Sequence, residues 1–361
     1  MSFTRLAPTD FVISSDSITA PAWSSNQPTL ATFYTASSIS STSISAGAFY
    51  LNVYQTQSSV NGAAVQFAIA YGNINGSGSQ WYNNLVAGIS PSLTTYRQYE
   101  TLVYGAALSG SVQGFNFGGA ATNAPDIHAL NVDRNRYKES LFPGTFNLKI
   151  TGTDGTIQLC DNSNNVTVVT YLDCGRVFDL VSGSFGNAVG ITPTNGIAPG
   201  YTASGSYGFY LPDIGTIILN TSALALGSVY GGVGLTVDRE NYGSPSYTLN
   251  ASASYTSTNN TLLYQAISSS GYFQLNSQET ISSDYVFVRV GNSEYNYSSN
   301  PTFVTGSGEV LYSTMIYNPQ TFITTVGLYN DNTELLAVAK MSRPLVKDFT
   351  KEALIRVKLD W

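Results

Sequence analysis

The side chains that most often carry out catalysis are scarce in this sequence. Its one histidine, His128, stands in the strand-like run Asp126-Ile127-His128-Ala129-Leu130. A Ser-His-Asp triad or a multi-histidine metal site needs more partners than this, so we predict a structural His128 rather than a general base beside Asp126. Paired carboxylates can hydrolyse glycosides, but a pair such as Asp238 and Glu240 is expected by chance among 22 acidic residues. We therefore expect no enzyme and no catalytic residues.

The templates for metal and cofactor sites also fail. The run Asp161-Asn162-Ser163-Asn164-Asn165 begins like a calcium loop, but Val166 stands where that loop needs glycine and Leu172 where it needs glutamate. We interpret the run as a turn. The sequence has neither a Gly-x-x-x-x-Gly-Lys-Ser/Thr phosphate loop nor a dinucleotide-binding glycine fingerprint. We therefore expect no metal and no cofactor.

The composition is polar with few charges. Charged residues make up 10% of the 361 residues, against roughly 25% in ordinary soluble proteins. Hydrophobic residues make up 43%, which favours a folded chain over a disordered one. The net charge of −7 gives no basic field for nucleic acid. Because few charges leave little repulsion between copies, the composition favours a surface that is buried against neighbouring proteins.

The cysteine count and the hydropathy indicate a protein made in a cytoplasm. Cys160 and Cys174 are too few for a disulfide-stapled secreted protein of this size. We favour two buried free thiols, with a single bridge as the alternative. Residues 1–6 lack the apolar stretch of a signal peptide. No run approaches the roughly 18 apolar residues of a membrane helix, so we expect no membrane partner.

The elements that must position any site are mainly β-strands. Residues 146–150 and 156–160 alternate in polarity around Asp154-Gly155, which predicts a hairpin. Residues 166–171 are expected to add a third strand to this hairpin. Asn220 and Asn260 could each cap a short helix. Further strands are expected at residues 65–71, 216–219, 247–255 and 284–290.

We expect a mainly β fold of antiparallel, sandwich-like sheets with a few short helices. Residues 1–60 are rich in Ser, Thr and Ala and predict an extended N-terminal arm. Residues 61–240 are expected to form a β-rich domain. Residues 241–361 are expected to form a second β-rich domain with a C-terminal assembly segment.

A charged cluster occupies residues 131–144 of this weakly charged chain. Arg134, Arg136 and Lys138 alternate in sequence, which would place all three on one face of a strand. Such a strand could be a solvated edge or a contact between subunits. We keep both interpretations.

The last residues are unusually basic for an acidic protein. Residues 334–340 predict a strand after an Asn330-Asp331-Asn332 turn, Pro344 predicts a loop, and residues 354–361 predict a closing strand. That last strand would have Ile355, Val357 and Leu359 on one face and Arg356, Lys358 and Asp360 on the other. We predict that this segment contacts an acidic partner. Six of the fifteen cations lie here: Lys340, Arg343, Lys347, Lys351, Arg356 and Lys358.

Several stretches resemble a known family. The most specific are Tyr295-Asn296-Tyr297, Val326-Gly327-Leu328-Tyr329-Asn330-Asp331-Asn332 and the ending Arg356-Val357-Lys358-Leu359-Asp360-Trp361. Residues 67–72 with 76–79, 96–99 and 136–139 are also close to that family. Together they resemble virion structural proteins of large contractile-tailed bacteriophages, including T4-related cyanophages. The resemblance implies a tail or baseplate component in the virion, whose partners are other virion proteins and copies of itself.

Two alternatives to the tail or baseplate remain open. One is a neck, collar or capsid-decorating protein. The other is a receptor-binding module that contacts host glycans, for which Trp23, Trp81 and Tyr82 could provide stacking rings. Packing in a core or an interface is the commoner use of such rings.

Overall fold

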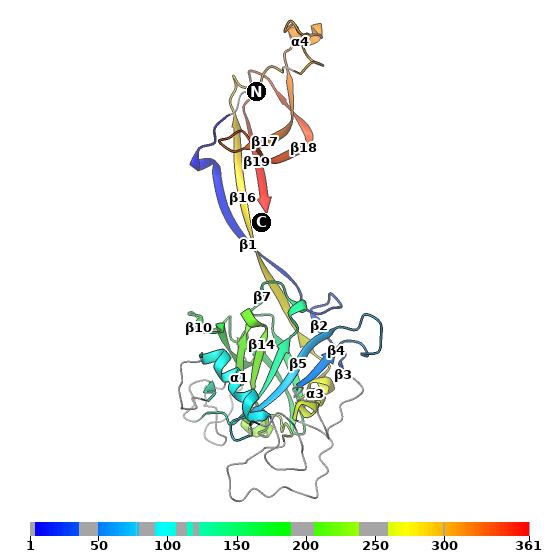
Figure 1. The fold of residues 1–361 in the computed structure, drawn as a ribbon, viewed down its shortest axis with the longest axis vertical. Helices are drawn as coiled ribbons and strands as arrows, with labels where there is room; N and C mark the ends of the chain where they lie inside the picture. The colour runs from blue at the N-terminus through cyan, green and yellow to red at the C-terminus, as the bar shows by residue number, and fades with distance from the viewer. Residues whose placement is uncertain are drawn as a thin grey trace, which may run out of the picture. The chain divides into compact units, whose positions relative to one another are not determined.

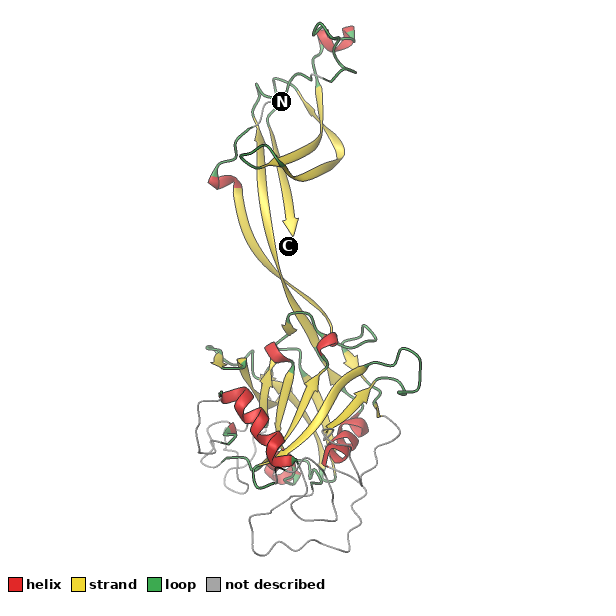
Figure 2. Cartoon of the chain, viewed as in Figure 1, coloured by secondary structure: helices red, strands yellow, loops and turns green. Residues whose placement is uncertain are grey.

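The computed structural model describes residues 4–35, 50–76, 78, 91–105, 114–117, 123–188, 206–237, 259–298 and 300–360. The expected mainly β fold, with antiparallel sheets and a few short helices, is confirmed (Figures 1 and 2). The chain forms two compact units. Unit 1 comprises Met1–Ser17 and Thr280–Trp361, and unit 2 comprises Ile18–Glu279. This division differs from the boundaries expected at residues 60 and 240, because unit 1 is assembled from segments that are distant in sequence.

Unit 2 is built on one large sheet. Among the described residues, 13 strands form this sheet, in the order β2-β15-β8-β9-β11-β13-β14-β6-β5-β4-β3, with β10 and β12 paired to β11. The strands are β2 (Thr29–Leu30), β3 (Tyr34–Thr35), β4 (Tyr50–Tyr54), β5 (Val65–Asn73), β6 (Asp126–Val132), β8 (Asn147–Gly152), β9 (Gly155–Asp161), β10 (Thr170–Leu172), β11 (Gly175–Ser184), β12 (Asn187–Ala188), β13 (Gly208–Leu211), β14 (Thr216–Asn220) and β15 (Phe273–Gln274).

Short helices and one small strand complete unit 2. Helix α1 packs along β5 (Figure 1). Helix α3 packs on β8. The small strand β7 (Ser140–Leu141) pairs with residues 277–278 of β16 (Asn276–Val290). The helices are α1 (Ser92–Tyr104), α2 (Thr221–Leu224) and α3 (Asn259–Ser270), with 3-10 turns η3 (Arg134–Arg136), η4 (Pro212–Ile214) and η5 (Ser228–Tyr230).

Strand β14 shows that both faces of this sheet are covered. All of its residues are buried. Ile217 and Leu219 belong to the larger apolar cluster, whereas Ile218 belongs to a smaller one, because successive side chains point to opposite faces. Helix α1 contributes Tyr96 to the smaller cluster. The helix approaches β5 so closely that a Cβ on Gly72 would lie 2.8 Å from the Tyr96 Cα.

The large sheet curls back on itself. Leu30 on β2 and Val53 on β4 are near opposite ends of the strand order, yet both are buried in the larger cluster. The ring of Phe67 on β5 lies 5.3 Å from that of Phe273 on β15. Trp23 contacts both rings, at 6.3 and 4.8 Å, and its Nε1 donates to the Phe273 carbonyl oxygen at 3.0 Å. The part of the expected extended arm around Trp23 and Leu30 is therefore core structure, whereas β1 is mostly exposed and residues 36–49 lie outside the described residues.

The predicted hairpin around Asp154-Gly155 is confirmed. Strands β8 and β9 pair antiparallel from Asn147↔Cys160 to Gly152↔Gly155. The turn expected at residues 161–165 is also confirmed, and Asp161 holds it by accepting from the backbone N–H of Ser163 at 3.0 Å. The third strand expected at residues 166–171 is wrong, because the long strand β11 pairs with β9 in its place. Only residues 170–172 form a strand, which pairs with the first residues of β11.

The other local predictions mostly agree with the structure. The strands expected at residues 65–71, 216–219 and 284–290 correspond to β5, β14 and β16. Both short helices are present, and the Asn220 side chain caps α2 by accepting from the Ala223 N–H at 3.2 Å. The cap predicted for Asn260 is wrong, because Asn260 lies inside α3. The strand expected at residues 247–255 lies outside the described residues.

Unit 1 contains two small sheets that share a thin core. One sheet has the order β1-β16-β19, and the other is the β17–β18 hairpin. Val286, Val326 and Val357, from β16, β17 and β19, form the buried centre. The face predicted for Ile355, Val357 and Leu359 is confirmed, since all three lie in this cluster. The elements are η1 (Pro8–Asp10), β1 (Phe11–Pro21), α4 (Ser313–Tyr317), β17 (Thr321–Tyr329), β18 (Leu335–Lys347) and β19 (Ala353–Asp360), besides β16.

The prediction of a loop at Pro344 is wrong, because Pro344 lies within β18. Proline removes a backbone donor and is tolerated where a ladder is interrupted. The register of β18 with β17 jumps between Ile323↔Leu345 and Thr325↔Lys340, so that residues 341–344 form a bulge without paired partners on β17. The predicted turn after β17 is confirmed, and the Asn330 N–H donates to the Glu334 carbonyl oxygen at 3.0 Å.

Replacing Trp23 tests whether the N-terminal segment holds the curled sheet together. The side chain is 1% exposed, so Trp23→Ala should lower the free energy of unfolding of unit 2 by about 3–5 kcal/mol. Urea unfolding followed by circular dichroism measures this change. Val168→Ala is the control, because Val168 is 80% exposed. Equal stability of the two variants would contradict a core role for Trp23.

Candidate interaction surfaces

The single histidine is part of the framework of unit 2. His128 on β6 is 1% exposed. Its Nε2 lies 3.1 Å from the carbonyl oxygen of Asn259, and its Nδ1 lies 2.8 Å from the Thr221 hydroxyl. Since a carbonyl only accepts, Nε2 carries the proton and Nδ1 accepts from the hydroxyl. The ring thus joins β6 to α2 and α3, and burial lowers its pKa to about 4.

The cysteines and the asparagine-rich turn serve packing. Cys160 and Cys174 are both buried free thiols, as favoured from the sequence. Burial raises the pKa of Cys160 to about 11. Asp161 accepts from the Gly144 and Ser163 N–H groups, which uses its carboxylate to hold a turn. Within the described ranges, no group of three or more His, Cys, Asp or Glu side chains could hold a metal ion.

The charged cluster at residues 131–144 does not form the expected strand face. Arg134–Arg136 is a 3-10 turn, because the Asp133 carboxylate accepts from the Asn135 N–H at 2.9 Å and favours a turn. The Arg134 guanidinium lies 4.7 Å from the centre of the Tyr137 ring and donates to the Tyr137 carbonyl oxygen at 2.7 Å. Lys138 is exposed and Arg136 is half-buried. A contact between subunits at this cluster stays a prediction.

The C-terminal cations have different environments, although the sequence groups them together. Lys351 pairs with Asp348 at 3.0 Å, and Lys358 pairs with Asp360 at 2.9 Å. Arg356 lies 5.4 Å from the centre of the Tyr285 ring. Lys340 and Arg343 are exposed on β18, with no ion pair to the residues that the structure describes.

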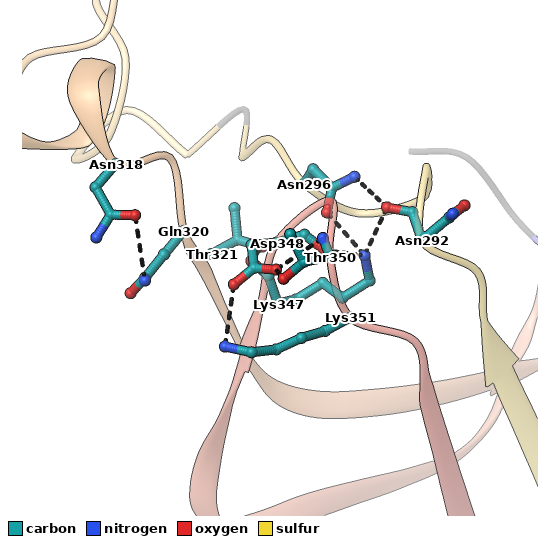
Figure 3. Close-up of polar contacts among 9 residues, drawn as sticks. All are labelled: Asn292, Asn296, Asn318, Gln320, Thr321, Lys347, Asp348, Thr350 and Lys351. Carbon is teal, nitrogen blue, oxygen red and sulfur yellow. Dashed lines mark hydrogen bonds and ion pairs between the residues drawn. The ribbon is translucent and has the colours of Figure 1, made fainter.

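Lys347 is fully buried and cannot contact a partner directly. It is 0% exposed. Its Nζ donates to the Asn292 carbonyl oxygen at 3.0 Å, to Asn296 Oδ1 at 2.7 Å and to the Asp348 carbonyl oxygen at 2.9 Å (Figure 3). An ammonium group has three N–H donors, and each has an acceptor here. Lys347 therefore ties the end of β18 to the segment that follows β16.

Next to this lysine, Asp348 organises the short connection to β19. Its carboxylate accepts from the Thr350 hydroxyl and the Thr350 N–H, and it pairs with Lys351 (Figure 3). The hydrogen bond from Thr350 and the contact with Lys351 lower the Asp348 pKa to about 2. No local pattern predicts the Lys347 site, because its acceptors Asn292 and Asn296 lie about fifty residues upstream.

A tyrosine-rich segment, residues 295–317, provides an exposed aromatic surface on unit 1. Tyr317 is 89% exposed. Tyr297 is also exposed, but it packs edge-on against Phe303 and its hydroxyl donates to the Gly308 carbonyl oxygen at 2.8 Å. The sequence has no Lys or Arg between residues 290 and 339. Large exposed apolar side chains of the segment are Tyr295, Tyr297, Leu311, Tyr312, Ile316 and Tyr317.

The aromatic residues singled out for glycan stacking are not part of this surface. Trp23 is buried in unit 2 and cannot stack on a sugar. Trp81 and Tyr82 lie outside the described residues, as do Asp238 and Glu240. The tyrosine-rich segment was recognised from its sequence only as a family motif, because its spacing does not show which rings are exposed.

No family model, curated protein or solved structure matches this chain. The fold alone defines the class of this protein, which is a mainly β protein with two compact units. In the part of the chain that the structure describes, no helix is long and apolar enough to cross a membrane.

The buried histidine should make unit 2 sensitive to acid. The pKa is about 4 in the folded chain and about 6.5 when unfolded. The unfolded chain therefore binds the proton first, so stability is full above pH 6.5 and falls as pH drops toward 4. The loss should total about 3 kcal/mol. Urea unfolding of the wild type and of His128→Gln across this range measures the difference, and equal pH slopes would contradict it.

Removing the Lys347 ammonium should destabilise unit 1. Lys347→Met removes the buried donor of three hydrogen bonds, at a cost of about 3 kcal/mol. Hydrogen exchange of the β18 and β19 amides measures this loss, as faster exchange in the variant. Lys351→Met is the matched control, because that lysine is exposed and should leave exchange nearly unchanged. Equal exchange in both variants would show that the three bonds contribute little.

Proposed function

We propose that this chain is a structural protein of a bacteriophage particle, a component of the tail or baseplate that joins neighbouring proteins. The observation that carries the proposal is the surface of unit 1. Among its described residues, large exposed apolar side chains outnumber the buried ones. Exposed apolar surface of this extent is typical of proteins that are covered by partners. Phe322, Leu336, Val338 and Leu354 are examples on its strands.

The sequence resemblance and the chemistry of the described residues support the same proposal. The motifs shared with phage virion proteins include residues of the exposed hairpin β17–β18 and of β19. The one histidine is held by Thr221 and Asn259 within the framework, which leaves it without a substrate-facing role. Large interfaces with polar and aromatic contacts would perform the function in place of a catalytic site.

A second candidate is a receptor-binding module, and the tyrosine-rich segment favours it. Exposed tyrosine rings beside amide groups such as Asn318 and Gln320 suit sugar stacking and hydrogen bonding. Binding of the isolated chain to a glycan array, lost in Tyr317→Ala, would favour this candidate over a purely structural role.

The main proposal predicts that the protein is a fixed part of the particle. Mass spectrometry of purified particles of the phage that encodes it should find this chain at a constant ratio to the other tail proteins. Its presence only in the infected cell, and not in particles, would contradict the proposal.

Charge reversal at the two exposed cations of β18 tests whether they contact a neighbour in the particle. Incorporation of each variant into particles is measured. Lys340→Glu and Arg343→Glu should each lower incorporation several-fold if the basic segment contacts an acidic partner. Arg5→Glu is the control, since Arg5 is another exposed cation of unit 1. Incorporation that falls equally in all three variants would indicate a general effect of charge, and not a contact at β18.

A further inference from the structure

The sheet β1-β16-β19 of unit 1 has an unprotected edge at β1. This strand pairs with β16 alone among the described residues. Phe11, Val12 and Ile13 are consecutive and are 49%, 48% and 77% exposed, so apolar side chains are uncovered on both faces. Natural edge strands are usually guarded by lysine, proline or bulges. Within unit 1, β1 has none of these, and Asp16 is its one charged residue.

The opposite edge of the same sheet has complementary properties. Strand β19 also pairs with β16 alone among the described residues. Leu354 is 62% exposed there. Its exposed charges include Arg356, which lies over the Tyr285 ring, and Lys358, which is already paired with Asp360. One edge is thus apolar with a single acid, and the other is apolar with two cations and one acid.

From these two edges we infer that β1 of one copy pairs with β19 of a second copy, so that the three-stranded sheets of unit 1 join into a continuous sheet. The partner is a second copy, because the sheet of each copy has both open edges. These edges, β1 and β19, are similar in length and opposite in net charge. Pairing would cover the exposed apolar side chains of the two edges, Phe11, Val12, Ile13 and Leu354. Because the two edges differ, the contact is head-to-tail and closes into a ring when the rotation permits.

This inference deepens the proposed assembly role and rests on it. It also explains why unit 1 has so little core of its own. Three valines form its buried centre, and a two-stranded hairpin such as β17–β18 is marginally stable by itself. Two neighbouring copies, one at each edge, would supply the strand contacts that each sheet lacks.

Disulfide trapping in the full chain tests the pairing. The double variant Ile13→Cys with Leu354→Cys cannot link within one chain, because β16 separates the strands by two strand spacings, about 10 Å. A disulfide needs Cα atoms within about 7 Å. Mild oxidation should therefore give linked multimers on a non-reducing gel. Three further double variants cover the neighbouring registers. They are Val12→Cys with Leu354→Cys, Val12→Cys with Arg356→Cys, and Ile13→Cys with Arg356→Cys.

Matched controls identify the edges involved. Ile13→Cys alone and Leu354→Cys alone should stay monomeric on the gel, and links in either one would indicate self-pairing of identical edges and overturn the inference. Val168→Cys with Leu354→Cys controls for random collision, since Val168 is 80% exposed in unit 2. No links in any of the β1–β19 double variants would also overturn it.

A second measurement does not depend on register. Ile13→Lys places a charge on the open edge and should weaken self-association at least about tenfold in analytical ultracentrifugation. Val168→Lys should leave it unchanged. If the chain enters particles but neither trapping nor Ile13→Lys behaves as expected, the β1–β19 contact is wrong and the assembly role stands. Absence of the chain from particles would instead remove the proposed function.

Discussion

The contact of Trp23 with Phe67 and Phe273 is the constraint on which unit 2 depends. It connects strands from opposite ends of the strand order, and so curls a long sheet around one apolar cluster. Without this contact, the apolar cluster that includes Leu30 and Val53 would lose its largest buried ring. Strand β14 lies in the middle of the same sheet with both of its faces buried, and the backbone of Asn259 on α3 reaches His128.

Unit 1 follows a different physical logic. Its strands have few buried side chains, and hydrogen bonds of polar side chains connect its backbone segments. Lys347 joins the end of β18 to residues 292 and 296 through three oxygen acceptors. The Asp348 carboxylate then organises the turn into β19. This arrangement holds the backbone of unit 1 in place while leaving its apolar side chains uncovered, as expected of a part whose core is completed by neighbours.

Local patterns in the sequence predicted what depends on neighbouring residues. Alternation predicted the β8–β9 hairpin, β14 and the inward face of β19, and asparagine capping predicted α2. Contacts between distant residues could not be predicted in this way. The serine-rich stretch around Trp23 gave no sign that β15 would cover the ring. The strand face expected for Arg134, Arg136 and Lys138 failed because Asp133 starts a turn. Charge alone grouped Lys347 with exposed cations, since no sequence pattern shows which acceptors a lysine will reach.

The order in which unit 1 is assembled has a consequence for biosynthesis. Residues 11–17 of β1 leave the ribosome before unit 2, whereas residues 280–290 of its partner β16 are made after unit 2. The pairing spans more than 250 residues, and such long-range contacts form slowly. Until β16 is made, β1 has both edges open. A nascent chain in this state is at its most aggregation-prone, so the timing of translation, as much as final stability, determines the yield of correctly folded protein.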